Sequence, residues 1–246
     1  MKILAVRGIS RGRMVPPSAN GYQVISPPTS QISPIVFVVD DDVSVRESLE
    51  LLIRHEGLEV ETFTSAHEFL NHSRAYKPSC LILDISLPSL NGLDLQKHVA
   101  VERPDMPIIF ITGHGDIPMT VQAMKAGAVE FLTKPFSDDV LLDAIRTALE
   151  RSKVLIGRDT ELRRLKARYS RLTSREREVM VHVAAGLPNK QVGSELGISE
   201  ITVKAHRGNM MRKMGANSLA ELVSMAARLR LTRPSAMNLP TNKQSL

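Results

Sequence analysis

The chain has 246 residues and a formal net charge of +6 at pH 7, a total that combines two segments of opposite charge. Residues 35–152 carry −9, whereas residues 171–233 carry +6. This asymmetry predicts that the second segment binds a polyanion and that the first has a different function. The absence of any run of about 18 uncharged apolar residues excludes a membrane span, and the lone Cys80 excludes an intramolecular disulfide. We therefore expect a cytoplasmic protein with two domains and no membrane partner.

The two ends of the chain have no periodic pattern. Residues 10–34 are rich in Ser, Pro and Gly, so residues 1–34 are expected to be a disordered leader or sequence upstream of the true start codon. Residues 234–246 are expected to be a flexible tail.

Between residues 35 and 152, short apolar runs alternate with segments that have helical periodicity. The apolar runs are 35–39, 58–63, 80–84, 107–112 and 129–133, and the helical segments are 44–56, 65–73, 91–102, 117–126 and 137–151. Continuous apolar runs are typical of parallel strands that are buried on both faces. Five such repeats predict an α/β domain with a doubly wound, five-stranded parallel sheet, in which ligands bind beyond the carboxyl ends of the strands.

Polar residues gather at those strand ends. They are Asp40, Asp41 and Asp42 after the first strand, Asp84 at the end of the third, Thr112 at the end of the fourth and Lys134 after the fifth. A single aspartate after a strand often caps the next helix, and Asp42 or Ser44 is expected to do so here. The neighbouring carboxylates favour a Mg²⁺ or Mn²⁺ ion, and an added lysine and hydroxyl favour a phosphoryl group with one carboxylate as nucleophile.

Residues 153–170 are expected to form a helical linker. Its apolar residues fit a heptad frame that extends backwards into the preceding helix, with Leu141, Ala144, Ala148, Leu155, Leu162, Leu165, Tyr169 and Leu172 in the seam. Arg151 and Arg158 also occupy seam positions, and Gly157 interrupts the pattern. A coiled coil and an amphipathic helix resting on a domain are therefore both possible.

Residues 171–233 have no strand pattern and predict an all-α domain of four helices. Thr173 and Glu176 have the spacing of a capping box, and Ser199 and Ser218 are expected to begin the last two helices. A helix, a tight turn at residues 197–198 and a longer helix have the spacing of a helix-turn-helix.

The second helix of this pair has two distinct faces on a helical wheel. Val203, Met210 and Met214 are expected to pack inward. The outward face carries Ile201, Lys204, Ala205, Gly208 and Arg212. The residues expected to meet phosphates at its edges are Lys190, Thr202, Arg207 and Lys213. A solvated basic face is the alternative, but the charge of the segment favours DNA.

The motifs FVVDDD, LILDISLPSLNGLDL, IIFITGHGD and KAGAVEFLTKPF together resemble the CheY-like receiver domains of two-component response regulators, which have a flavodoxin-like fold. The resemblance covers residues 35–152 and implies that Asp84 is the phosphoacceptor. It further implies that Asp40, Asp41, Asp84 and the main-chain carbonyl of Ser86 bind Mg²⁺. Thr112 and Lys134 are implied to contact the phosphoryl oxygens. Phe131 is implied to be the aromatic switch residue. Ile85-Ser86-Leu87-Pro88 departs from the commonest pattern after the phosphoacceptor, which leaves the lifetime of the phosphoryl group open.

The segment from LTSRERE to NSLAEL resembles the LuxR-type helix-turn-helix of the FixJ/NarL class of regulators. This resemblance covers about residues 171–228 and implies a module that binds repeated operator sites in double-stranded DNA as a dimer. Lys204 and Ala205 match positions that commonly meet base edges, whereas Gly208 departs from the bulkier residues of many relatives.

Together these features predict a transcriptional response regulator that is not itself an enzyme. A sensor histidine kinase is expected to phosphorylate Asp84, and phosphorylation is expected to promote a homodimer through the helix at 117–126 and the strand at 129–133. DNA and RNA polymerase are the further partners expected. A DNA-binding protein that uses the receiver only as a dimerisation scaffold is one alternative. A Mg²⁺-dependent phosphohydrolase with an aspartyl-phosphate intermediate is another, although Ser86 replaces the second acid/base carboxylate that it would need.

Overall fold

A computed structural model of the chain describes residues 33–231, apart from residues 74, 75, 89 and 114–116. The predicted tail and nearly all of the predicted leader lie outside these described residues. Within the described part, no helix is both long enough and apolar enough to cross a membrane.

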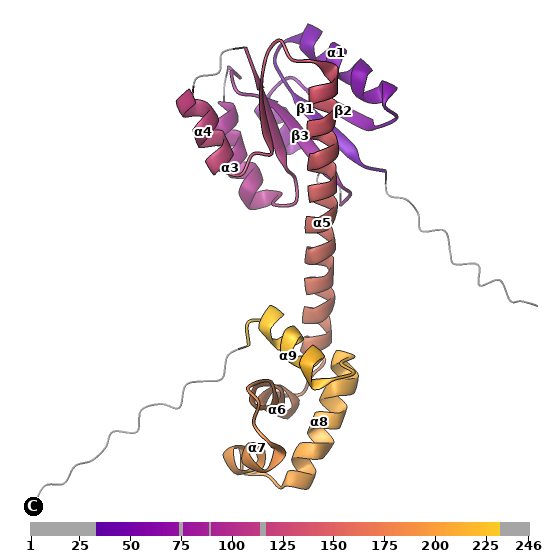
Figure 1. The fold of residues 1–246 in the computed structure, drawn as a ribbon, viewed down its shortest axis with the longest axis vertical. Helices are drawn as coiled ribbons and strands as arrows, with labels where there is room; N and C mark the ends of the chain where they lie inside the picture. The colour runs from indigo at the N-terminus through magenta and orange to yellow at the C-terminus, as the bar shows by residue number, and fades with distance from the viewer. Residues whose placement is uncertain (1–32, 74–75, 89, 114–116, 232–246) are drawn as a thin grey trace, which may run out of the picture. The chain divides into compact units, whose positions relative to one another are not determined.

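The N-terminal domain, residues 35–152, contains a five-stranded sheet (Figure 1). Its strands are β1 (Ile35–Val39), β2 (Glu59–Phe63), β3 (Ser79–Asp84), β4 (Ile108–Thr112) and β5 (Glu130–Thr133). They pair in the order β2-β1-β3-β4-β5, and every pairing is parallel. All residues of β1, β3 and β4 are buried, as their continuous apolar runs predicted. The predicted parallel sheet is therefore confirmed.

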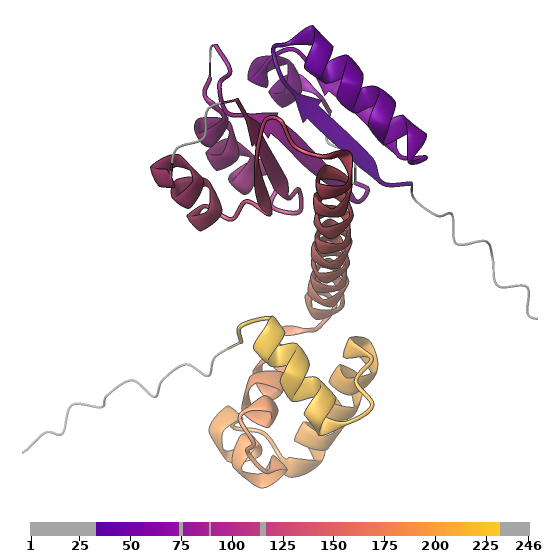
Figure 2. The same ribbon diagram turned by 45° about the horizontal axis from the view of Figure 1, so that its top comes forward.

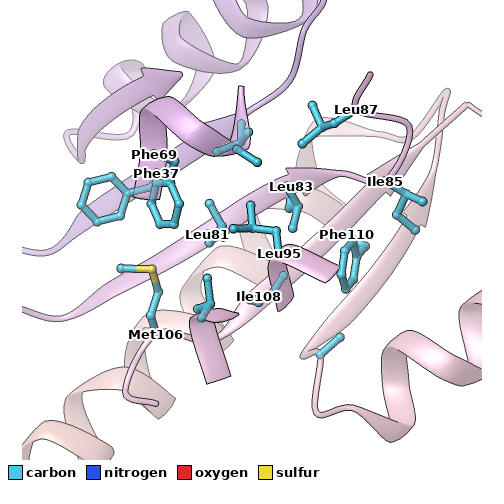
Figure 3. Close-up of a cluster of buried hydrophobic side chains, with 14 of the residues drawn as sticks. Phe37, Phe69, Leu81, Leu83, Ile85, Leu87, Leu95, Met106, Ile108 and Phe110 are labelled. Atoms are coloured by element: carbon cyan, nitrogen blue, oxygen red, sulfur yellow. The ribbon is translucent and has the colours of Figure 1, made fainter. Parts of the chain in front are cut away.

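Helices cover both faces of this sheet. They are α1 (Val43–His55), α2 (Ala66–Asn71), α3 (Gly92–Glu102), α4 (Ile117–Lys125) and α5 (Asp138–Ser170). Helices α1 and α5 pack around Val36 and Ile82 on one face. Helices α2, α3 and α4 pack on the other, where Figure 3 shows Phe37, Leu81 and Phe110 among the buried side chains. The domain is thus doubly wound, and its two cores leave the carboxyl edge of the sheet free to carry polar residues.

Helix α5 is longer than the sequence predicts for the domain, because it continues without a break through the predicted linker (Figures 1 and 2). Leu141 and Ala148 are buried against the sheet, whereas Leu165 belongs to the core of the C-terminal helices. Of the predicted seam, only Leu155 and Leu162 remain as partly exposed leucines between these two ends. A coiled coil normally needs three or four heptads. The packing of a single chain accounts for both ends of the frame, and the coiled coil stays a prediction.

The C-terminal module, residues 171–231, consists of four helices. They are α6 (Ser174–Ala184), α7 (Asn189–Leu196), α8 (Glu200–Met214) and α9 (Leu219–Arg228). The capping box of Thr173 and Glu176 is present, and the hydroxyls of Ser199 and Ser218 accept hydrogen bonds from backbone amides of α8 and α9. Three completely buried residues of α8 contribute to the core, as predicted: Val203, Met210 and Met214.

A glycine sets the close approach of α7 and α8. A Cβ atom on Gly193, in α7, would lie 2.7 Å from the carbonyl oxygen of Ile198. Such a contact is shorter than packed atoms tolerate, so only glycine allows α7 to lie this close to the turn before α8. Gly197 ends α7 with a φ of 67°, in the left-handed region that favours glycine. These two glycines produce the predicted helix-turn-helix.

Candidate functional site

The carboxyl edge of the sheet brings together the polar residues that were predicted to meet there. Asp40 directly follows β1, Asp84 is the last residue of β3 and Lys134 directly follows β5. The Lys134 Nζ atom lies 2.8 Å from Asp40 Oδ2 and 3.0 Å from Asp84 Oδ2. Thr112 is completely buried at the end of β4. The sheet therefore places an ammonium group between two carboxylates that are 44 residues apart in the sequence.

Backbone amides orient both carboxylates. Asp84 Oδ1 accepts a hydrogen bond of 2.9 Å from the amide of Ser86, and Asp40 Oδ1 accepts one of 2.9 Å from the amide of Asp42. Asp42 itself is the N-cap of α1, since its side chain accepts from the amide of Ser44. The remaining Oδ2 atoms of Asp40 and Asp84 point to the same ammonium group. The turns that follow β1 and β3 thus fix the orientation of the two carboxylates.

Gly92, which the sequence analysis did not single out, allows the loop after Asp84 to close. Its amide donates to the carbonyl of Ile85 at 3.1 Å, and a Cβ at this position would lie 2.8 Å from the carbonyl oxygen of Asp84. Any side chain at this position would therefore push the backbone of Asp84 away. The helical segment predicted at 91–102 includes Gly92, but the close contact depends on how α3 packs against β3.

The electrostatics of this edge favour a cation. Burial raises the pKa of Asp40 although Lys134 and the Asp42 amide oppose the rise, and the neighbouring Asp84 raises it further. Burial would lower the pKa of Lys134, but its hydrogen bonds to the two carboxylates outweigh this and raise it. Lys134 forms ion pairs with Asp40 and Asp84, and Asp41 adds a third carboxylate to the cluster. The site therefore keeps an excess of negative charge.

The donor atoms fit a small divalent cation. One carboxylate oxygen from each of Asp40, Asp41 and Asp84 lies within 4.8 Å of the others. Asp41 is exposed, so its carboxylate can reach an ion that arrives from solvent. Hard oxygen donors of this kind suit Mg²⁺ or Mn²⁺. The residues present are thus compatible with the metal that the sequence predicts.

Phe131, the predicted switch residue, lies in β5 beside this edge. It is half-buried, and its ring centroid lies 6.3 Å from that of Phe110, its partner in the β4–β5 register. Thr112 follows on β4 two residues after Phe110, on the same pair of strands. The threonine hydroxyl and the aromatic ring are therefore carried by adjacent strands.

A groove beside α1 was not predicted from the sequence. It has a volume of about 760 Å³ and runs between α1 and the segment after β5. Leu51, Leu52 and Phe136 contribute apolar surface, and Lys134 lies at one side of it. Leu51 is among the exposed large apolar residues of the domain. An apolar surface therefore begins next to the ammonium group that bridges Asp40 and Asp84.

In the C-terminal module, α8 presents the outward face that the helical wheel predicted. The exposed residues include Ile201, Lys204, Ala205, Gly208 and Arg212. Lys204 Nζ lies 3.0 Å from a carboxylate oxygen of Glu200, and Arg212 donates to the side chain of Asn209. Both cations lie on the helix surface and can exchange these local partners for phosphate groups.

The four predicted phosphate contacts lie in different environments. Lys190 is exposed on α7, and the Thr202 hydroxyl lies 2.8 Å from that of Ser199. Arg207 donates to the side chain of Asn189 at 3.1 Å and thereby joins α8 to α7. Thr202 and Arg207 lie on α8 and Lys190 lies on α7, and their phosphate contacts stay a prediction.

Lys213 differs from this prediction. Its Nζ atom lies 2.7 Å and 2.9 Å from the two carboxylate oxygens of Glu176, which is buried in α6. The helical wheel placed Lys213 at the edge of α8 but contained no information on what packs against that edge. The carboxylate from α6 holds the ammonium group, which indicates a structural role for Lys213, and its phosphate contact stays a prediction.

Comparisons with known proteins agree with this architecture. The family model of the response regulator receiver domain matches residues 36–146, and that of the luxR family of bacterial regulatory proteins matches residues 170–226. The chain therefore belongs to the two-component response regulators that join a receiver domain to a LuxR-type DNA-binding domain, a family of transcription regulators.

Several known response regulators and related proteins are similar to this chain over most of their length. Nodulation protein W of Bradyrhizobium diazoefficiens is 53% identical over 79% of this chain and 86% of the relative. The response regulator protein TmoT of Ectopseudomonas mendocina is 47% identical over 80% of this chain and 89% of the relative. Among solved structures, the response regulator StyR matches with a TM-score of 0.69 and 49% identity, over 80% of this chain and 99% of that one.

Proposed function

We propose that this response regulator accepts a phosphoryl group on Asp84 from a sensor histidine kinase and then binds DNA as a homodimer. The observation that carries the proposal is the bridging position of Lys134 between Asp84 and Asp40, beside a third carboxylate. A carboxylate nucleophile needs nearby positive charge to stabilise the charge that develops on the phosphoryl oxygens. Lys134 supplies one such charge, and the carboxylates can hold a second as a metal ion.

In the proposed reaction, a carboxylate oxygen of Asp84 attacks the phosphorus of a kinase phosphohistidine. The new O–P bond forms as the P–N bond breaks, and the imidazole leaves with the electron pair and takes a proton from water. Lys134 and the hydroxyl of Thr112 bind the transferred phosphoryl oxygens. Mg²⁺, or Mn²⁺, held by Asp40, Asp41, Asp84 and the main-chain carbonyl of Ser86, would neutralise charge on the same oxygens.

The groove beside α1 is the proposed docking surface for the kinase. Apolar and polar residues of α1 line it together with Phe136, and Lys134 is also part of its lining. A phosphohistidine-bearing helix that buries apolar side chains in this groove would place its phosphoryl group next to Asp84. The proposal therefore joins the recognition surface and the reacting carboxylate on one side of the domain.

The proposed homodimer uses α4, which packs against β5. Ile117, Val121 and Met124 are exposed apolar residues at positions i, i+4 and i+7 of α4, so they form one stripe. A second copy that presents the same stripe would bury it in a symmetric contact. When Thr112 turns toward the phosphoryl group, Phe131 gains space to move inward, which would reshape the surface between α4 and β5.

The outward face of α8 is the proposed DNA-binding surface. Lys204, Ala205 and Gly208 would face base edges in the major groove, while Lys190, Thr202, Arg207 and Arg212 would contact phosphates. A dimer would join two such faces and bind repeated half-sites more tightly than a monomer binds one. Because the proposed DNA target and RNA polymerase lie in the cytoplasm, we place the protein there.

Labelling of Asp84 by a phosphoryl donor tests the proposal. The full chain is incubated with a radiolabelled acyl phosphate and Mg²⁺, and the protein-bound label is measured. The wild-type chain should be labelled and the Asp84→Ala variant should not, because Asp40, the other carboxylate that contacts Lys134, is completely buried. Asp143→Ala, at an exposed carboxylate of α5, is the matched control and should be labelled like the wild type. Full labelling of Asp84→Ala would contradict the assignment.

A further inference from the structure

Ile201, in the first turn of α8, is one of the most exposed large apolar residues of the described chain. Its side chain is 80% exposed, although it is β-branched and lies in a helix whose other β-branched aliphatic residue, Val203, is completely buried. It does not contribute to the core of the module. Single exposed apolar residues are common on protein surfaces. Exposure alone therefore does not indicate that Ile201 binds a partner, and the residues around it have to be considered.

Its neighbours form an apolar stripe on the outward face of α8. Ile201, Ala205 and Gly208 occupy positions i, i+4 and i+7 and are all exposed. The outward face of a surface helix is ordinarily polar. A Cβ on Gly208 would meet no atom within 4 Å, so packing within the module does not require glycine there. Glycine destabilises a helix interior relative to alanine, and no contact within the described residues requires glycine at this position.

The charges around the stripe indicate what covers it. Lys204 lies next to Ala205, Arg212 extends the outward face by one turn beyond Gly208, and Lys190 is exposed on the adjoining α7. A protein partner with an apolar surface would not require positively charged side chains on both sides of the stripe. The major groove of DNA offers both features, because phosphates line its edges and the C5 methyl group of thymine is an apolar group on its floor.

We propose that Ile201 reads a thymine in each half-site by packing against its C5 methyl group. The inference rests on the proposed binding of α8 in the major groove and adds a specificity-determining residue to it. Residues near the N-terminus of a recognition helix reach base edges most readily, and Ile201 is the second residue of α8. The small side chains at Ala205 and Gly208 let the helix backbone approach the bases, so that an aliphatic side chain in the first turn reaches the methyl group.

The experiment removes the methyl group from the DNA and the side chain from the protein. Full-length protein, with Mg²⁺ and an acyl-phosphate donor present, first selects its preferred duplex from a pool of random sequence. Each thymine of that duplex is then replaced singly by deoxyuridine, which lacks only the C5 methyl group. For wild-type protein, one replacement per half-site should weaken binding about fourfold, the effect of losing one buried methyl group.

Three variants separate this contact from general effects. Ile201→Ala should bind the thymine duplex more weakly and should show no further loss at the deoxyuridine position. Lys204→Ala should bind more weakly but keep the fourfold sensitivity to deoxyuridine. Val101→Ala removes a side chain that is 82% exposed in α3 and should behave like the wild type.

Two results would overturn the inference in different ways. If Ile201→Ala kept the same sensitivity to every deoxyuridine as the wild type, Ile201 would not read a methyl group, although the module would still bind DNA. If the wild-type protein selected no duplex at all, the proposed DNA binding itself would fail together with the inference.

Discussion

The buried carboxylate of Glu176 links three parts of the C-terminal module. It accepts a hydrogen bond from the amide of Thr173 at the start of α6, and it also accepts from Lys213 of α8. Burial would raise the pKa of Glu176, but the hydrogen bonds from Lys213 and Thr173 outweigh it and lower the pKa below its ordinary value of 4.5. The carboxylate is therefore charged in the folded module, and its charge depends on Lys213.

Replacing Lys213 by methionine should destabilise the module by about 2 kcal/mol at pH 7, because it leaves a buried carboxylate with one hydrogen-bonding partner fewer. The folded pKa of Glu176 is lowered, so its contribution is fully present above pH 4.5 and is lost as the pH falls through the folded pKa. The stability difference between wild type and variant should therefore shrink in acid. Urea unfolding between pH 3 and pH 7 measures it.

Lys204→Met is the matched control for this prediction. Lys204 forms an exposed ion pair with Glu200 on the same helix, and its loss should change stability by less than about 0.5 kcal/mol. Equal effects of the two substitutions, or a Lys213→Met effect that did not change with pH, would contradict the structural role of the Glu176–Lys213 pair.

Helix α5 is fixed to the sheet by the hydroxyl of Ser152, which is completely buried. This hydroxyl accepts a hydrogen bond from the amide of Ser79 at 3.0 Å and donates to the carbonyl of Asp105 at 2.6 Å. Ser79 begins β3, which ends in Asp84, and Asp105 precedes β4, which ends in Thr112. One side chain of α5 thus contacts the starts of both strands that carry the candidate site.

Ser152→Ala should destabilise the N-terminal domain by about 2 kcal/mol, because it removes the hydrogen-bonding partner of a buried amide and of a buried carbonyl. Thermal unfolding followed by calorimetry measures the change. Ser170→Ala is the control, since the hydroxyl of Ser170 is exposed on the same helix and bonds only to its own preceding turn. That variant should stay within about 0.5 kcal/mol of the wild type. A Ser152→Ala protein as stable as the wild type would show that these two hydrogen bonds do not contribute measurably to the attachment of α5.

The two domains carry opposite charges, and the proposed function couples them. The acidic domain holds the candidate phosphoacceptor site, and the basic module holds the outward face of α8. They have separate hydrophobic cores, and α5 contributes side chains to the cores of both. A change in the first domain can therefore alter DNA binding by changing how two copies associate, without any change in the fold of α6 to α9.

Phosphorylation should increase the affinity for DNA by about tenfold, a typical coupling between two sites of a regulatory protein. The affinity of the full chain for its selected duplex is measured with and without an acyl-phosphate donor at several salt concentrations. Asp84→Ala should bind DNA with the basal affinity and should not respond to the donor. If the wild-type affinity were the same with and without the donor, phosphorylation would not control DNA binding, although DNA binding itself would stand.

Much of the fold and of the candidate site follows from local patterns. The buried strands appear as apolar runs, and the helix starts at Asp42, Thr173, Ser199 and Ser218 appear as capping residues. The meeting of Asp40 with Lys134, 94 residues apart, was also predictable, because the carboxyl ends of parallel strands always share one edge. The exposed face of α8 followed from the helical period alone.

Other features depend on which surfaces pack together, and local patterns do not contain that information. The heptad frame of α5 is the same whether its leucines meet a second helix or the two cores of their own chain, and tertiary packing buries both of its ends. The helical wheel of α8 does not distinguish Lys213 from other lysines at the edge of the helix. Its ion pair forms only because α6 places Glu176, 37 residues away in the sequence, against it. Gly92 and the groove beside α1 likewise arise where elements distant in sequence meet. Periodicity and capping act within a few residues, whereas burial and ion pairing depend on contacts that exist only once the chain has folded.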